Sequence, residues 1–491
     1  MDEIKTYHVG NLVYTKRTLF ALFFWLLWFD FSFMLMEAVI NPILQFRLKN
    51  DLKADSVMYL MIMSTVPSII NFVLNPIVSI KSDRHRGPHG RRIPFLLYTA
   101  PVVCISLALM GFGNDIAVWV HNIFLPDRSL NQLTIWTFGI LFLAFTVFNL
   151  MLSTVFYYLF NDVVPEPLFV KFTAWMRAVS VLAGMVYSWF IFGYSNRWGP
   201  LHLNLGFFEY HSENFWYPKL ILVGAAVFYG IAATLALLKI KEPEYPPPPP
   251  LGEGGGFLQK TGNTVRTIVR ECFSHRFYRI YFIVLMLDWM SMQMGQFQNP
   301  ARLDMGINLQ LLGKISAGTG FISLILALLV AKFSSKYSPL PLLIFALSLQ
   351  VATSTIAWLF LIPGRSSTFY LGVEVTRSLV NLPILTIAAV AVGALQMTIL
   401  PRARYGQFCA AQSMLRMILP GICGSILAGW LMRTLEHHFG NYAWRFAFVW
   451  STIFLAMSLV GYVVLYREWK RLGGKDSFTP PTVDEASASV N

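Results

Sequence analysis

The chain has 491 residues, of which 56% are hydrophobic and only 13% are charged, and its mean hydropathy is +0.56. A soluble domain usually carries about 25% charged residues, so this composition excludes a soluble enzyme, a disordered chain and a disulfide-rich scaffold. The formal net charge of +13 would indicate a nucleic-acid partner in a soluble protein, but here its meaning depends on where the basic residues lie.

The apolar residues form long continuous runs, unlike the alternating pattern of a membrane β-barrel. Twelve of these runs are long enough to cross a bilayer as helices. In chain order, we predict spans at 18–44, 56–80, 93–113, 132–160, 168–194, 216–238, 278–300, 309–333, 339–363, 369–400, 406–432 and 442–466. An even number of spans places both termini on the same side of the membrane.

Lysine and arginine are distributed unequally between the two sides of this topology. With the N-terminus inside, roughly twice as many basic residues lie on the inner side as on the outer side, which is the positive-inside pattern. Both termini are therefore predicted to be cytoplasmic, in a multi-pass protein of the cell membrane such as a bacterial inner membrane. Topology accounts for the basic surplus, so no nucleic-acid partner is expected.

A segment rich in proline and glycine divides the spans into two groups of six. Five consecutive prolines, Pro246–Pro250, form a stiff rod, and the glycines that follow are flexible. The predicted domains are an N-terminal six-helix bundle (1–238), a cytoplasmic linker (239–277), a C-terminal six-helix bundle (278–467) and a cytoplasmic tail (468–491).

The first spans of the two halves share a sequence pattern. The stretch Trp28–Pro42 is WFDFSFMLMEAVINP, and Met286–Pro300 is MLDWMSMQMGQFQNP. At one constant offset, Asp30 matches Asp288, and both stretches end in Asn-Pro. A duplicated six-helix unit explains this match, and duplicated bundles are a common build of secondary transporters.

Four charged residues are predicted near the middle of the membrane. Asp30, Arg177, Asp288 and Arg416 lie about 13 to 18 Å from the inner ends of their spans at about 1.5 Å per residue. An ionisable group at this depth needs a partner or a cavity. Either the acids bind a ligand or a proton in a polar cavity between the halves, with the arginines as their partners, or they form static ion pairs between helices.

Three further charged residues lie within spans. Glu37 is close to the outer end of the first span, where it belongs to an outer gate or cavity wall, or is a plain interfacial carboxylate. Glu374 and Arg377 are spaced i, i+3, which favours a local ion pair. Arg377 is also deep enough to line the predicted cavity.

Uncharged polar residues in the spans allow two interpretations. Gln293, Gln296 and Asn149 either hydrogen-bond a ligand or hold neighbouring helices together. Zinc-protease, phosphate-loop and Cys/His metal motifs do not occur in the sequence. The chain is therefore not predicted to be an enzyme, and neither a cofactor nor a metal is expected.

A basic turn separates the second and third spans. The sequence from Ser79 to Phe95 is SIKSDRHRGPHGRRIPF, in which Asp83 is the only acid. Asp83 can accept charge-assisted bonds from an arginine or a helix N-terminus. This turn is either a latch for an inner gate or a simple membrane anchor.

The pattern SDRxRxxxGRRxPF in this turn resembles the corresponding loop of the major facilitator superfamily. Within that family it is similar to the sucrose-transporter and glycoside–pentoside–hexuronide:cation symporter group. The segment NDVVPE at 161–166 is similar to the equivalent segment of bacterial members. Ser79 departs from the pattern, because the family usually has glycine there.

The resemblance implies a fold and several residue roles. The fold would be all-α, with twelve transmembrane helices in two six-helix bundles that expose a central site to each side in turn. Arg177 would match an arginine implicated in sugar–proton coupling. The residues assigned to the inner gate are Asp83, Arg84, Arg91, Arg92 and Asp162.

We therefore expect a secondary active transporter that carries a sugar or glycoside together with a proton. An organic-anion or drug exporter of the same fold is one alternative, and a transport-dead membrane sensor is another. The expected partners are the small-molecule substrate, the proton and the lipid bilayer, and the chain is expected to be monomeric.

Overall fold

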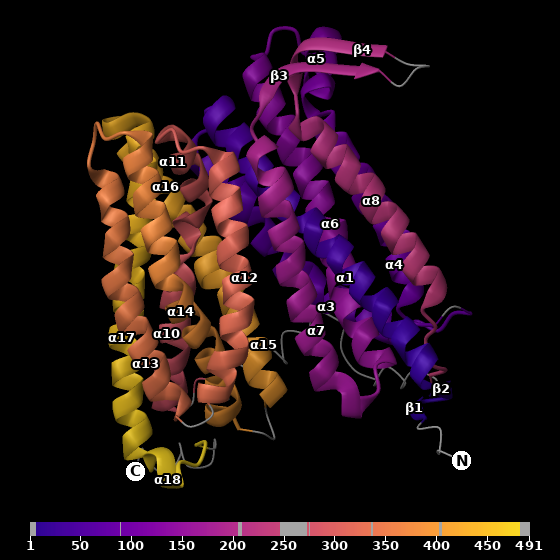
Figure 1. Ribbon diagram of the computed structural model, residues 1–491, viewed down its shortest axis with the longest axis vertical. Helices are drawn as coiled ribbons and strands as arrows, with labels where there is room; N and C mark the ends of the chain where they lie inside the picture. Colours follow the sequence, from indigo (N-terminus) through magenta and orange to yellow (C-terminus); the bar gives the residue numbers. More distant parts are fainter. Residues whose placement is uncertain are drawn as a thin grey trace, which may run out of the picture. The chain divides into compact units, whose positions relative to one another are not determined.

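The computed structural model describes residues 6–88, 90–204, 209–245, 273, 275–334, 337–401 and 405–481. Most of these residues are helical (Figure 1). Within these ranges, ten helices are long and apolar enough to cross a membrane. One of them, the 65-residue segment Gln407–Arg471, contains two predicted spans, and the predicted span 278–300 is divided by a 3-10 turn. The all-helical membrane fold with twelve spans is thus confirmed.

The chain divides into two compact units, Met1–Pro249 with Asn308–Phe321, and Pro250–Ile307 with Ile322–Asn491. Most of the predicted linker and the end of the predicted tail, residues 246–272, 274 and 482–491, lie outside the described residues. The predicted domain boundaries stay a prediction.

In the part of the chain that the structure describes, the first unit is built mainly from eight α-helices and two β-hairpins. Its elements are β1 (Tyr7–Val9), β2 (Leu12–Tyr14), α1 (Lys16–Gln45), η1 (Phe46–Asp51), α2 (Ser56–Leu60), η2 (Met61–Thr65), α3 (Val66–Arg84), α4 (Ile93–Gly111), α5 (Gly113–Ile123), α6 (Leu130–Val163), η3 (Glu166–Leu168), α7 (Phe169–Val186), η4 (Tyr187–Ile191), η5 (Phe192–Tyr194), β3 (Trp198–Asn204), β4 (Glu209–Trp216) and α8 (Pro218–Lys239).

The second unit holds the remaining helices, apart from the first half of α12. These elements are α10 (Arg276–Ser291), η6 (Gln293–Phe297), α11 (Gln298–Asp304), α12 (Leu309–Ser334), α13 (Pro339–Ser354), η7 (Thr355–Leu361), α14 (Ser367–Ile399), α15 (Tyr405–Arg416), η9 (Met417–Gly424), α16 (Ser425–Phe439), η10 (Gly440–Arg445), α17 (Phe446–Arg471) and α18 (Gly474–Ser477).

Helix α12 is shared between the two compact units. Its first residues belong to the first compact unit. The packing there is close, because a Cβ on Gly313 would stand 2.2 Å from the carbonyl oxygen of Ser188. Only glycine allows two backbones to approach this closely.

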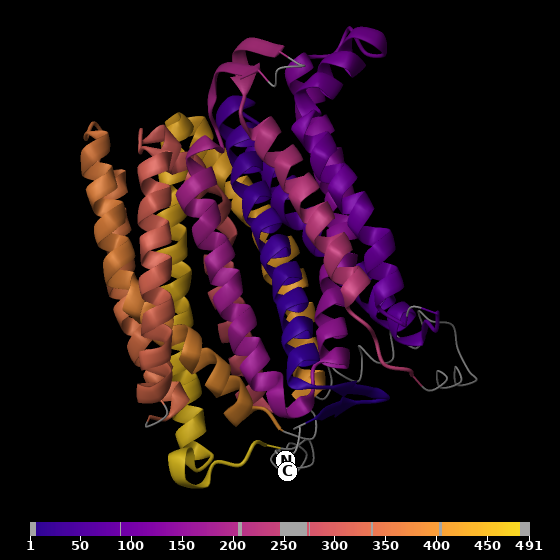
Figure 2. The ribbon, with the colours of Figure 1, turned by 45° about the vertical axis from the view of Figure 1, so that its right-hand side comes forward.

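The helices of the first unit pack in a continuous series. Helix α1 contacts α7 on one side and α8 on the other (Figure 2), and the series continues from α8 through α4 and α6 to α3. The core between them is aromatic. Phe29 of α1 lies 4.4 Å from Phe156 of α6 and 5.9 Å from Tyr229 of α8, measured between ring centroids. All three rings are buried, and such pairs add to the stabilisation from burial alone.

The second unit is organised in the same way around other helices. Helix α17 contacts α10 and α13, and α13 contacts α14. Tyr278 of α10 packs against Phe408 of α15 with ring centroids 4.6 Å apart. These buried contacts hold α10, the helix that carries Asp288, against α15.

Several helices begin where the sequence provides a start signal. Thr15 caps α1 in a reciprocal arrangement with Thr18, and Asp55 accepts bonds from the first amides of α2. Helices α4, α8 and α13 carry proline in the first turn, where its missing N–H is not needed.

Two short β-hairpins were not predicted from the sequence. Strands β1 and β2 pair with Tyr7 opposite Tyr14, and β3 and β4 pair with Trp198 opposite Trp216. The strands contain three to eight residues, which is too short to stand out beside spans of twenty apolar residues.

Candidate functional site

The carboxyl group of Asp30 is completely buried in the first unit. Its Oδ2 accepts a hydrogen bond of 3.1 Å from the hydroxyl of Ser180 on α7. Its Oδ1 is also buried and has no hydrogen-bond partner among the described residues. The phenol of Tyr157 on α6 lies within electrostatic range of Asp30, Glu37 and Arg177. Helices α1, α6 and α7 therefore bring one polar cluster together inside an apolar bundle.

Glu37 is the second acid of this cluster. Its Oε1 accepts a hydrogen bond of 2.8 Å from Nδ2 of Asn149 on α6. This bond joins two helices of the same bundle, as the interhelical interpretation of Asn149 expects.

Arg177 does not pair with Asp30. Its side chain is exposed, and it forms no ion pair within the described part of the chain. Ser180 lies three residues after Arg177 on α7. Its hydroxyl, and not the expected arginine, contacts the carboxyl group of Asp30. The expectation of this ion pair is wrong because α7 turns Ser180 rather than Arg177 toward α1.

In the second unit, the expected ion pair between Asp288 and Arg416 is also not formed. Asp288 on α10 is partly buried, and its carboxylate has no ion pair or hydrogen bond in the described ranges. Arg416 at the end of α15 is exposed, and its guanidinium lies 3.4 Å from the ring centroid of Trp289. A cation–π contact to the neighbour of Asp288 thus replaces the expected pair with Asp288 itself.

Glu374 is the centre of a buried cluster in the second unit, with only 3% of the residue exposed. Its Oε1 accepts bonds from Arg377 at 2.6 Å and from Arg302 at 2.9 Å. The predicted local pair with Arg377 is therefore confirmed, while Arg302 was not predicted, because it is 72 residues away in sequence. Oε2 of Glu374 and Nε of both arginines are buried without partners among the described residues.

Gln293 and Gln296 lie in the 3-10 segment η6 rather than in a continuous span. Both are partly buried. Nε2 of Gln293 donates a bond of 3.2 Å to the carbonyl oxygen of Trp289. The same carbonyl oxygen also accepts a bond of 3.2 Å from the backbone N–H of Met292, where the α-helical ladder of α10 ends.

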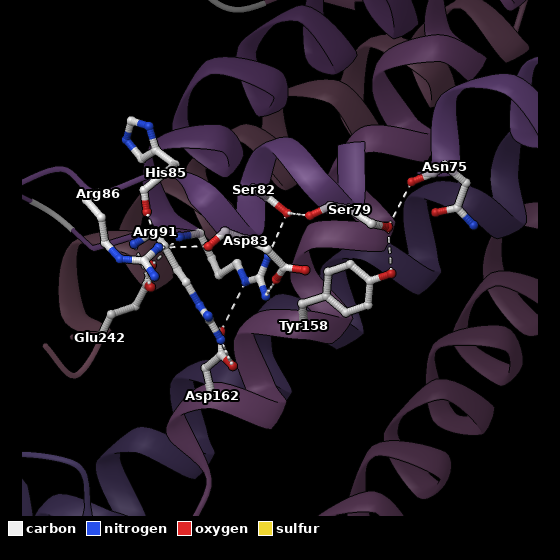
Figure 3. A network of polar contacts seen from close by, with 11 residues as sticks. Asn75, Ser79, Ser82, Asp83, His85, Arg86, Arg91, Tyr158, Asp162 and Glu242 are labelled. Atoms are coloured by element: carbon white, nitrogen blue, oxygen red, sulfur yellow. Dashed lines mark hydrogen bonds and ion pairs between the residues drawn. The ribbon is translucent and has the colours of Figure 1, made fainter. Parts of the chain in front are cut away.

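Four of the five residues assigned to the inner gate, Asp83, Arg91, Arg92 and Asp162, form a compact network (Figure 3). Arg91 binds Asp162 through two parallel bonds of 2.6 and 3.0 Å. Arg92 donates to Asp162 at 3.0 Å, to the hydroxyl of Ser82 at 2.6 Å and to the carboxylate of Asp83. The network joins the end of α3, the start of α4 and the end of α6, while Arg84 is the last residue of α3.

Glu242, just after α8, completes this network. Its two carboxylate oxygens accept bonds of 2.6 to 2.9 Å from the backbone amides of Arg91, Arg92 and Ile93. Figure 3 shows Glu242 beside Arg91. These amides are at the N-terminus of α4, where the helix dipole favours a negative charge. Gly90 makes this approach possible, because its φ is +96° and a Cβ there would stand 2.6 Å from Glu242.

Tyr245 covers Arg91 from the other side, with the guanidinium carbon 4.1 Å from the ring centroid. Burial, reinforced by Asp162 and Glu242, raises the pKa of the Tyr245 phenol, so this group stays neutral. Burial alone would lower the pKa of Arg91, but its bonds to Asp162 outweigh this effect and raise it. Arg91 therefore stays charged beside a neutral Tyr245 over the physiological pH range.

Ser79 and Tyr158 extend the network along α3 and α6. Their hydroxyl groups share a hydrogen bond of 2.8 Å, a contact that the family's usual glycine could not make. Arg92 lies 5.0 Å from the ring centroid of Tyr158. The departure from the family pattern at Ser79 thus adds a contact between two helices.

Sequence reasoning missed five side chains that complete these clusters. They are Ser180, Tyr157, Arg302, Glu242 and Tyr245. Each belongs to a common polar residue type that forms no sequence motif, and each contacts its partner only in the folded chain. Among the described residues, no three His, Cys, Asp or Glu side chains converge closely enough to hold a metal ion.

Comparison with known proteins identifies the family of this chain. The model of the Major Facilitator Superfamily matches residues 26–422. Sucrose transport protein SUT5 of Oryza sativa subsp. indica is 46% identical over 48 residues, which cover 10% of this chain and 9% of that protein. Sucrose transport protein SUT4 of the same subspecies is 40% identical over 48 residues, which cover 10% of this chain and 8% of that protein. The chain thus matches only a short stretch of these relatives.

Solved structures with a similar fold cover nearly the whole chain. A bacterial homologue of the human lysosomal transporter Spinster has a TM-score of 0.66 and 11% identity, over 95% of this chain and 100% of that one. The D-xylose-proton symporter has a TM-score of 0.57 and 13% identity, and the match covers 91% of this chain and 97% of that one. The nucleoside transporter NupG has a TM-score of 0.57 and 13% identity, and the match covers 91% of this chain and 99% of that one.

At these identities the structures show the fold alone. The family model, however, spans most of the sequence, and the twelve helical spans agree with it. The chain therefore belongs to the Major Facilitator Superfamily of membrane transporters and is not an enzyme.

Proposed function

We propose that this transporter carries a small polar solute, a sugar or glycoside, across the membrane together with a proton. The observation that carries the proposal is the buried carboxyl group of Asp30, which has one hydrogen-bonded oxygen and one without a partner in the described structure. A charged carboxylate is costly to bury in a membrane protein, whereas the protonated form is less so. A group in these surroundings is suited to bind and release a proton as the protein changes conformation.

The nearby polar groups support a coupling role for this acid. The hydroxyl of Tyr157 lies within electrostatic range of Asp30, Glu37 and Arg177, so a change of charge on any of these three residues acts on Tyr157. Alternating access, the transport mode of duplicated helical bundles, would change the solvation of the cluster in each cycle. The short match to sucrose transport proteins and the basic turn at 79–95 support a sugar or glycoside as the cargo.

The topology belongs to the same proposal. The bias of lysine and arginine supports cytoplasmic termini and a location in a bacterial inner membrane. On this assignment, the network around Asp162 lies at the cytoplasmic end of the first unit.

A second candidate function is the transport of an organic anion. In the second unit two guanidinium groups share the single carboxylate of Glu374, which leaves an excess positive charge in a buried cluster. The unpartnered Nε groups of Arg302 and Arg377 would suit an anionic group on the solute.

Transport measurements on purified protein in liposomes separate these candidates. The protein would be tested for uptake of radiolabelled neutral sugars, uronates and dicarboxylates, each with and without an inward proton gradient. The proposal predicts that a neutral sugar accumulates only with the gradient. Accumulation of acids but not of neutral sugars would favour the anion candidate, and ligand binding without uptake would favour a sensor.

A further inference from the structure

A long apolar groove runs along the outside of the first unit. It has a volume of about 740 Å³ and lies between α1 and α7, which are neighbours in the fold (Figure 2). Its lining is almost entirely aromatic and aliphatic, from Phe20 and Phe24 on α1 to Trp175 and Leu182 on α7. These side chains face outward: Phe20 is 75% exposed and Trp175 is 54% exposed.

The charged residues of the groove lie at one end. Lys16 is the first residue of α1, and Lys171 is in the first turn of α7. Both lysines line the groove, both are exposed, and neither forms an ion pair with an acid in the described part of the chain. The strand residue Tyr7 lies at the same end. Among the residues that the structure describes, none of those lining the groove is acidic.

The dimensions of the groove fit one leaflet of a bilayer. From Lys16 to Phe31 helix α1 rises about 22 Å, at about 1.5 Å per residue. One leaflet measures about 20 to 22 Å when its polar headgroup region is included, since the whole bilayer is about 40 to 45 Å thick. Lysine side chains can bury their methylene groups while the ammonium reaches the headgroup layer. A groove with this length has room for an acyl chain below a headgroup held by the two lysines.

We propose that this groove is a binding site for an anionic phospholipid, with Lys16 and Lys171 holding the phosphate and the α1–α7 surface holding an acyl chain. The charge of the groove selects the occupant, because two cations and no acid in its described lining favour a lipid with a net negative charge over a zwitterionic one. On the proposed topology, this lipid belongs to the cytoplasmic leaflet. The site does not depend on the identity of the transported solute.

Native mass spectrometry of the purified, detergent-solubilised protein tests this site. The probes are palmitoyl-oleoyl phosphatidylglycerol, which is anionic, and palmitoyl-oleoyl phosphatidylcholine, which is zwitterionic. The wild-type protein is expected to bind the anionic lipid more tightly. Replacing both lysines, Lys16→Gln with Lys171→Gln, is expected to weaken binding of the anionic lipid by about thirtyfold, since each lysine near an anionic lipid surface contributes about fivefold and the two factors multiply.

Two control variants separate the site from a general effect of charge. Lys16→Arg with Lys171→Arg keeps both charges and should retain binding. Lys239→Gln with Lys475→Gln removes two exposed lysines outside the groove and should leave binding unchanged.

A change in the apolar part of the groove tests its contribution. Phe24→Ala with Trp175→Ala should weaken binding of both lipids, because each truncation removes apolar contact with the acyl chain. The proposal is overturned if the double lysine-to-glutamine variant binds phosphatidylglycerol as the wild type does, or if the control lysine pair causes an equal loss. It is also overturned if the two lipids bind the wild type equally well.

Discussion

Asp30 and Asp288 occupy matching positions in the two repeated spans but have different surroundings. Asp30 is completely buried and accepts a bond from Ser180, whereas Asp288 is only partly buried next to Trp289, which lies under Arg416. The repeat therefore predicts that both positions carry an acid, but not which side chains meet it. The neighbours of each acid depend on how the surrounding helices are rotated about their axes. Adjacent residues of a helix point about 100° apart, so a small rotation changes which side chain faces the acid.

At the scale of single residues, Glu374 allows a direct test of how much a buried counterion contributes to stability. Glu374→Gln leaves Arg302 and Arg377 without a counterion in a buried site, and removing one member of such a cluster costs about 3–5 kcal/mol. We expect a clear fall in the thermal unfolding temperature of the purified protein, followed by tryptophan fluorescence.

Glu468 is the matched control for this variant. It also pairs with two arginines, Arg276 and Arg471, but both of these arginines are more than 60% exposed. Glu468→Gln should therefore change stability by at most about 1 kcal/mol. Equal shifts in the two variants would show that burial does not strengthen the Glu374 cluster.

At the scale of elements, the sequence predicts where helices lie better than how they are interrupted. The twelve apolar runs correspond to helices, because length and continuity of apolar sequence are strong signals. The break at η6, in contrast, depends on polar residues around Gly295 in a stretch that still fits a membrane span. The β3–β4 hairpin lies in a polar connection between spans, where pairing depends on register rather than composition.

The N-terminus of α4 offers a prediction for one element. Glu242→Gln replaces the carboxylate that accepts three backbone amides with a neutral side chain that has a single acceptor oxygen. Loss of a helix cap costs about 1 kcal/mol, so hydrogen exchange at the amides of Arg91, Arg92 and Ile93 should become about fivefold faster. Hydrogen–deuterium exchange with mass spectrometry would measure this change.

Glu244 provides the control for that experiment. It is exposed, and its backbone N–H, rather than its side chain, donates to Asn11. Glu244→Gln should leave exchange at the start of α4 unchanged. An equal increase in both variants would contradict the capping role of Glu242.

At the scale of the whole molecule, the sequence predicts the proximity of the basic-turn residues well, while their gating role stays a prediction. The sequence motif places Asp83, Arg91 and Arg92 in one short turn, so their proximity follows from their spacing. Their partner Asp162 was assigned through the family resemblance, and Glu242 could not be found because it reaches the turn from 150 residues away. The cavity between the two halves stays a prediction, since it depends on how the halves are arranged.

The network around Asp162 leads to a prediction about the balance between conformations. Arg91→Ala with Arg92→Ala removes the charged bonds that hold α3, α4 and α6 together at this end. We expect a shift in the balance between inward- and outward-open states with little change in solute affinity. Labelling of a single cysteine placed near the cytoplasmic end of α6 would measure the shift.

The control removes two other arginines near the predicted cytoplasmic surface. Arg276→Ala with Arg279→Ala leaves the network intact, because both residues lie at the start of α10. Labelling at the wild-type rate in the Arg91→Ala, Arg92→Ala protein would argue against a gating role for the network.

The central claim is that Asp30 couples solute movement to a proton, and solute-driven proton movement tests it most directly. Liposomes containing the protein and a pH-sensitive dye would receive an inward gradient of a transported sugar at equal starting pH. We predict that the lumen acidifies with wild type and with the exposed control Asp127→Asn, but not with Asp30→Asn, which should still exchange labelled for unlabelled sugar. Acidification by Asp30→Asn at the wild-type rate would contradict the account.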